Sequence, residues 1–147
     1  MSIKETLSQD LKLALKEKDT IRKNTVQSIR AAILQFEKDN LTELNDDGIL
    51  DIIAKELKKR KDVLPEYEKS GREDLITQLN REIEIVMGYL PSQLSEDELD
   101  EIVLKAIEET GASTMKDMGA VMAAVMPKVR GRADGRMINT LAKKHLM

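Results

Sequence analysis

Cysteine is absent from the 147 residues, which excludes disulfides, thiolate metal sites and cysteine nucleophiles. Aromatic residues make up only 2% of the chain, so no platform for stacking single-stranded bases is visible. No apolar run approaches the roughly 18 residues of a membrane span, and the first residues, MSIKETLSQD, lack the apolar core of a signal peptide. Their acidic residues also argue against a mitochondrial transit peptide, which is normally poor in acids. We therefore expect a soluble, cytoplasmic protein with no membrane partner.

Proline is also scarce, with three residues in the whole chain, whereas charged residues make up 35% and apolar residues 41%. Such a composition favours helices built on Leu, Ile, Ala, Lys and Glu, and the apolar share is enough to bury a core. We therefore predict an all-α fold.

The first part of the chain repeats apolar residues at helical spacing in four stretches, about 3–18, 20–37, 49–68 and 75–90. Ser2 is the expected N-cap of the first helix, Asp19 or Thr20 that of the second, and Asp46 or Asp47 that of the third. Pro65 lies inside the third stretch, where we expect a kink or break. These four helices form the predicted N-terminal domain, residues 1–92.

A second unit begins at LSEDEL, where Ser95 and Glu98 match a capping box. Three short helices are expected, at about 96–109, 114–126 and 135–146, with Gly111 ending the first and Pro127 ending the second. They form the predicted C-terminal three-helix domain, residues 93–147.

Candidates for a catalytic, metal or cofactor site all fail on a missing group. ELNDDG resembles the start of a calcium loop, but Ala54 stands where the bidentate glutamate is needed. His145, the only histidine, has no positioned partner in the sequence and is expected to be an exposed terminal residue. Neither a P-loop nor a GxGxxG motif is present. We therefore predict no catalytic residues, no metal and no cofactor.

The most unusual stretch is PKVRGRADGR, residues 127–136, with four basic residues and two glycines. Residues 127–147 carry a net charge of +5, so the remaining 126 residues carry −8. Such an asymmetry favours a polyanionic partner at the basic end. The glycines provide backbone freedom, Asp134 can cap the last helix, and guanidinium groups bind phosphate oxygens in pairs. A solvated turn between helices is the alternative.

Two further stretches have both a structural and a functional interpretation. Met115, Met118, Met122 and Met126 recur along one helix face, which is typical of core packing and also of an adaptable docking groove. KELKKRKD, residues 55–62, is a charge run that favours a solvated helix face, and the alternative is that Lys58, Lys59 and Lys61 line up with the basic end and extend a phosphate track.

Two long motifs, YLPSQLSEDEL from Tyr89 and MGAVMAAVMPKVRGRADGRMINTLAKKHL from Met118, closely resemble the YqeY-like family. The C-terminal part of that family is similar to the tail domain of the B subunit of bacterial glutamyl/aspartyl-tRNA amidotransferase. The resemblance implies tRNA as a partner, together with an amidotransferase or an aminoacyl-tRNA synthetase. Pro65 departs from the family's third helix, and the chain lacks the catalytic cradle and the amidase subunit.

The leading hypothesis is therefore a tRNA-binding accessory module related to glutamine-dependent amidation, which contacts the backbone of structured tRNA. A component of a carbon–nitrogen ligase with glutamine as amido-N-donor, and a protein-interaction scaffold that uses the methionine-rich helix, are the alternatives. The resemblance and the charge asymmetry together give the predicted RNA-binding residues, which are Lys128, Arg130, Gly131, Arg132, Asp134, Gly135, Arg136, Lys143 and Lys144.

Overall fold

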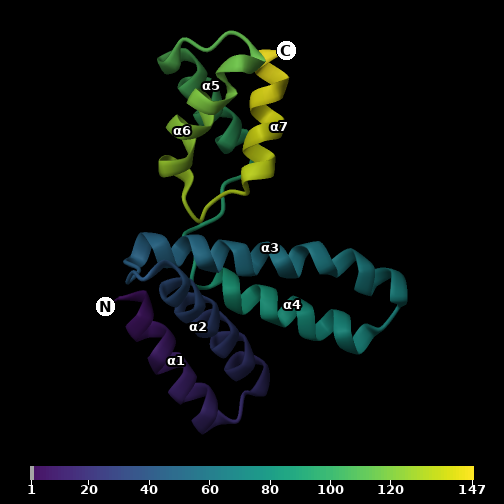
Figure 1. Ribbon diagram of the computed structural model, residues 1–147. Coiled ribbons are helices and arrows are strands. Elements are labelled where there is room, and N and C mark those ends of the chain that lie inside the picture. The colour runs from purple at the N-terminus through teal and green to yellow at the C-terminus, as the bar shows by residue number, and fades with distance from the viewer. Residues whose placement is uncertain (1) are drawn as a thin grey trace. The chain divides into compact units, whose positions relative to one another are not determined.

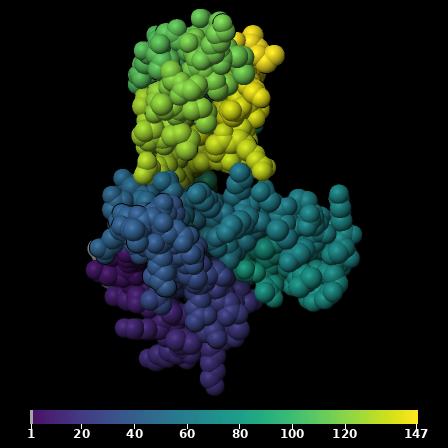
Figure 2. All heavy atoms as spheres, viewed as in Figure 1, coloured from purple at the N-terminus to yellow at the C-terminus, as the bar shows by residue number. Residues whose placement is uncertain are grey.

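Seven α-helices and one 3₁₀ turn, without any β-strand, make up the part of the chain that the computed structural model describes, residues 2–147 (Figure 1). The predicted all-α class is confirmed. The chain divides into two compact units, Met1–Pro91 and Ser92–Met147. Figure 2 draws all heavy atoms and shows that side chains fill the spaces between the ribbons within each unit. The division into two domains, 1–92 and 93–147, stays a prediction.

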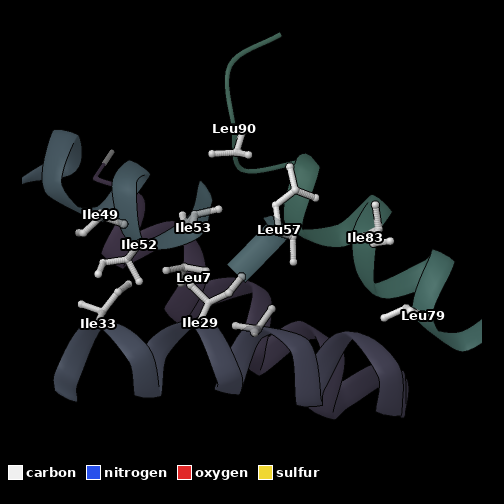
Figure 3. Close-up of a cluster of buried hydrophobic side chains, with 12 residues drawn as sticks. Leu7, Ile29, Ile33, Ile49, Ile52, Ile53, Leu57, Leu79, Ile83 and Leu90 are labelled. Atoms are coloured by element: carbon white, nitrogen blue, oxygen red, sulfur yellow. The ribbon is translucent and has the colours of Figure 1, made fainter. Parts of the chain in front are cut away.

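The first unit consists of two helical hairpins. Helices α1 (Ile3–Glu17) and α2 (Thr20–Asn40) form one, and α3 (Asp46–Ser70) and α4 (Glu73–Met87) form the other. Both hairpins contribute to one core, whose buried side chains are drawn in Figure 3. Its members are Leu7, Val26, Ile29, Ile33, Ile49, Ile52, Ile53, Leu57, Leu79, Ile83, Val86 and Leu90.

Local signals place most helix ends of the first unit. Ser2 accepts from the Glu5 amide at 3.2 Å, and Asp19 accepts from the Arg22 amide at 3.2 Å, as predicted. The third cap was predicted wrongly, because Asn45 rather than an aspartate accepts from the Gly48 amide at 2.9 Å. Asp46 instead accepts from the Ile3 amide at 3.1 Å, so it joins the starts of two helices.

The predicted break at Pro65 is absent, and α3 runs without interruption from Asp46 to Ser70. Val63, Leu64 and Tyr67 lie on both sides of the proline and pack against the core of the first unit. We infer that this packing offsets the single backbone hydrogen bond that a proline removes from a helix.

The second unit is a three-helix bundle of α5 (Glu96–Thr110), α6 (Met118–Val129) and α7 (Gly135–Leu146). The predicted capping box at Ser95 and Glu98 is present in both directions. A 3₁₀ turn, η1 (Met115–Asp117), precedes α6, although the sequence predicted an α-helix from residue 114. The buried side chains of the bundle are Leu99, Val103, Ala106, Val121, Val125, Val129, Ile138, Leu141, Ala142 and Leu146.

Pro127 does not end α6, as the sequence predicted, because the helix continues to Val129. Val125 and Val129 are both buried in the core of the bundle, one on each side of the proline. The extra turn therefore brings a third valine of α6 into the core and moves the start of the basic turn to Arg130.

A matched pair of truncations tests the core of the first unit. Ile29 is fully buried in it, whereas Leu15 is 54% exposed although the helical repeat predicted its burial. We expect Ile29→Ala to lower the free energy of unfolding by about 2–5 kcal/mol, since a buried cavity remains. We expect Leu15→Ala to change it by less than about 0.5 kcal/mol. Urea unfolding followed by circular dichroism measures both, and equal losses would contradict this core assignment.

Candidate nucleic-acid interface

The basic stretch forms the turn between α6 and α7. Arg130 leaves the helix with non-helical backbone angles, φ of −51° and ψ of 121°, and Gly131 then adopts a left-handed backbone with φ of 72°. Asp134 caps α7, because its side chain accepts from the Arg136 amide at 2.9 Å. The predicted cap and the predicted use of Gly131 are therefore present in the structure.

Three hydrogen bonds attach this turn to the segment that precedes α5. The Leu94 amide donates to the carbonyl of Arg132 at 2.9 Å, and the Gln93 side chain donates to the carbonyl of Gly131 at 2.8 Å. In return, the Arg132 Nε donates to the carbonyl of Ser92 at 3.0 Å. We call this set the 92–132 clamp. It joins residues about 40 positions apart and fixes the path of the turn.

The two glycines of the turn serve different purposes. Gly131 is buried and has a positive φ, a conformation that residues with a Cβ rarely adopt. Gly135 begins α7, has no positive φ, and a Cβ added there would meet no atom within 4 Å. We predicted that both glycines provide backbone freedom, and the structure uses it only at Gly131.

The basic side chains differ in what they contact. Lys128 Nζ lies 3.4 Å from a carboxylate oxygen of Glu109, and both side chains are about half exposed. Arg132 is half-buried and belongs to the 92–132 clamp. Arg136 is exposed at the start of α7. The turn therefore uses part of its positive charge for its own structure.

The remaining predicted bases, Lys143 and Lys144, are exposed in the last turn of α7. Arg136 and Lys143 are seven residues apart, which puts them on one helix face about 10 Å apart along the axis. The structure therefore groups the predicted residues from Lys128 to Arg136 in the turn and at the two helix ends beside it, and it leaves the two lysines at the other end of α7. We call the exposed face of α7 that carries Arg136, Lys143 and Lys144 the basic face.

Charge in the second unit is separated between helices. Helix α5 contains seven acidic residues and one lysine, whereas α7 contains no acidic residue. Three of the acids occupy the first turn of α5, where they complement the positive end of its dipole. A polyanion would therefore meet the least repulsion over α7.

His145 was predicted to be an exposed terminal residue, and this prediction was wrong. Its Nε2 lies 2.7 Å from the Asp100 Oδ1, and both side chains are about three-quarters buried. The pair joins the end of α7 to α5. The two residues lie 45 positions apart in the chain, so the local pattern around LSEDEL gave no sign of this contact.

The charge run at residues 55–62 is also less solvated than the sequence indicated. Arg60 is 11% exposed, and it bonds to Glu56 at 3.2 Å and to Glu82 at 3.3 Å. The guanidinium thereby links α3 to α4. Alternation of charge alone gave no signal for this bridge, since Glu82 lies on the neighbouring helix.

The methionine-rich face divides between core and surface. Met118 and Met122 pack against the core of the second unit, whereas Met115 and Met126 are 39% and 43% exposed.

Within residues 2–147, no group of three His, Cys, Asp or Glu side chains is arranged to hold a metal ion. No described helix is long and apolar enough to cross a membrane.

Comparison with known proteins gives a family match over residues 4–146, to the model described as Yqey-like protein. The chain is 31% identical over 132 residues to the protein "Altered inheritance of mitochondria protein 41, mitochondrial" of Pyrenophora tritici-repentis, which covers 86% of this chain and 71% of that protein. It is 36% identical over 107 residues to the protein of the same name in Kluyveromyces lactis, with 70% and 57% covered.

A third similarity is to a glutamyl-tRNA(Gln) amidotransferase subunit from Sulfurisphaera tokodaii, with 43% identity over 74 residues. That match covers 48% of this chain and 11% of the larger protein. It agrees with the amidotransferase resemblance noted in the sequence.

The predicted cytoplasmic location is contradicted by these comparisons. At least six of the similar proteins are named as mitochondrial. The prediction rested on the absence of a long apolar run and on the composition of the first ten residues.

The two glycines of the turn provide a test of its conformation. We expect Gly131→Ala to lower the free energy of unfolding by about 1–2 kcal/mol, because a Cβ is strained at a φ of 72°. Gly135→Ala is the matched control, and we expect no loss of stability there. Urea unfolding measures both variants. An unaffected Gly131→Ala variant would contradict the left-handed conformation at this position.

Proposed function

The chain belongs to the YqeY-like family, and on that premise we propose that it is a tRNA-binding accessory module related to glutamine-dependent aminoacyl-tRNA amidation. It docks on the sugar–phosphate backbone of structured tRNA through the basic turn and the basic face of α7. The observation that carries the proposal is the unequal distribution of charge within the second unit, where α5 holds seven acidic residues and α7 holds none. Of the α5 acids, Asp100 contacts α7, at His145.

The chemistry of this surface suits phosphate. Arg136 is a planar donor for two phosphate oxygens, and Lys143 and Lys144 add point charges farther along the same helix. Together they follow a backbone over about 10 Å of helix length. Aromatic residues are too few to stack unpaired bases, so recognition relies on the shape and charge of folded RNA.

The similarity to an amidotransferase polypeptide supports the choice of tRNA among folded RNAs. An amidotransferase or an aminoacyl-tRNA synthetase is the protein partner that this proposal favours. The chain's part in amidation is to hold tRNA, and the chemistry belongs to the partner. A ligase component that takes an active part in amide transfer is the competing view, which glutaminase and tRNA-amidation assays with and without an amidotransferase would distinguish.

A second candidate is a protein-interaction scaffold, which the exposure of Met115 and Met126 favours. Gly119, Ala120 and Ala123 are exposed on the same helix and let a partner approach closely. Under this view, a protein partner stays bound after nuclease treatment.

A salt titration tests the RNA proposal. Labelled tRNA is titrated with the full chain across a series of salt concentrations, together with the triple variant Arg136→Ala, Lys143→Ala and Lys144→Ala. Each phosphate contact contributes about 0.7–0.9 to the slope of log affinity against log salt. We therefore expect the triple variant to bind more weakly and to lose about 2–3 from the slope.

The matched control removes three exposed lysines of the first unit, Lys12, Lys55 and Lys61. It has the same change in net charge, and we expect it to retain most of the affinity and slope. Equal losses in both variants would indicate unspecific attraction and contradict a site on α7. A wild-type affinity that does not depend on salt would contradict backbone binding altogether.

A further inference from the structure

The outward face of α2 carries two leucines and two bases in alternation. Arg30, Leu34, Lys38 and Leu41 recur at intervals of four, four and three residues, so they share one side of the helix. Leu34 is 53% exposed and Leu41, at the C-cap, is 94% exposed. Both leucines of this outward face are thus among the large apolar side chains that the first unit leaves in solvent.

A groove lies beside this face, between α1 and α2. It has a volume of about 320 Å³ and is lined by Lys4, Leu7, Arg30, Ile33, Leu34 and Glu37, among others. Leu7 and Ile33 are 1% and 4% exposed, so they form an apolar floor that belongs to the core (Figure 3). Only a side chain inserted into the groove can reach that floor.

Some charged side chains in and beside the groove form ion pairs, and others do not. Lys4 Nζ lies 2.7 Å from Glu37, and Lys4 together with the Leu44 amide holds the pKa of Glu37 below its ordinary value. Glu37 therefore stays ionised, and its carboxylate balances the positive charge of Lys4. Arg30 and Lys38, in contrast, form no ion pair within residues 2–147 and are exposed. The surface presents two unpaired cations beside an apolar recess.

We propose that the α1–α2 groove and the Arg30–Leu41 face bind an acidic amphipathic helix of a partner protein. An aliphatic side chain of that helix enters the groove, and its carboxylates pair with Arg30 and Lys38. This is the helix-in-groove mode of recognition. The proposal does not depend on RNA binding, since it involves only residues of the first unit.

The observations favour a protein helix over other occupants. Arg30 and Lys38 are eight residues apart, about 12 Å along the axis, so carboxylates seven or eight residues apart on a partner helix match them. Leu34 lies between the two bases, where an apolar contact is available. A nucleic-acid backbone offers nothing to the two leucines, and a flat lipid surface does not reach the buried floor formed by Leu7 and Ile33.

The probe is a synthetic 18-residue helical peptide with leucines seven residues apart and glutamates on either side of them. A second peptide replaces every glutamate by lysine. We expect the acidic peptide to bind the full chain, with amide chemical-shift changes in α1 and α2, and the basic peptide to bind at least tenfold more weakly. The double variant Arg30→Glu and Lys38→Glu should reverse this preference.

The matched control is Lys55→Glu with Lys61→Glu, which makes the same change in net charge on exposed lysines of α3. It should keep the preference for the acidic peptide. Leu34→Ala should weaken binding at least fivefold, whereas Leu13→Ala, at a leucine 49% exposed on α1, should leave it unchanged.

Four outcomes would overturn the proposal. One is equal binding of the two peptides, and another is shift changes confined to other helices. The third is self-association in sedimentation that Leu34→Glu abolishes, because a second copy of the chain would then cover the groove. The fourth is binding of lipid vesicles or of tRNA that requires Arg30 and Lys38, without binding of the acidic peptide.

Discussion

The second unit depends on the 92–132 clamp. A turn with a left-handed glycine between two short helices has no reason to keep one path, because each peptide group can bond to water instead. Here the carbonyls of Gly131 and Arg132 both accept hydrogen bonds from residues 93 and 94, and the Arg132 side chain donates to residue 92. The same bonds place the start of α5 against the junction of α6 and α7. Residues 131 and 132 therefore have a structural role, which is to attach the turn to the segment before α5.

The 92–132 clamp and a nearby ion pair use some of the positive charges of the basic stretch. Arg132 is committed to a carbonyl, and Lys128 lies close to Glu109. The bases of α7 are exposed on a helix without acids, although Lys143 and Lys144 also complement the negative end of its dipole. These lysines therefore have a structural role beside the binding role that we propose for them. For that reason the proposed interface rests on the separation of charge between helices and not on a count of arginines.

The sequence predicted what is local and failed where distant residues meet. Ser2, Asp19 and the Ser95–Glu98 box were predicted correctly, because a cap involves only the next few residues. Pro65 and Pro127 were expected to interrupt helices, and packing of their neighbours against the cores overrides that local preference. The contacts of His145 with Asp100 and of Arg60 with Glu82 join different helices, so periodicity gave no sign of them.

The candidate site shows the same division. The positions of Asp134 as a cap and Gly131 as a left-handed residue follow from their types and spacing. The partners of Gly131 and Arg132 do not, because Gln93 and Leu94 lie nearly 40 residues earlier in the chain. Ser92, Gln93 and Leu94 lie at the predicted boundary between the domains, and the structure makes them part of the 92–132 clamp.

The most direct test of this account is hydrogen exchange at the Leu94 amide, which donates to Arg132 and belongs to no helix. If the clamp holds the turn, this amide exchanges as slowly as the buried amides of α7 and becomes fast together with them under mild denaturant. Exchange at the rate of an unstructured peptide, while α7 stays protected, would contradict the claim that the clamp fixes the basic turn.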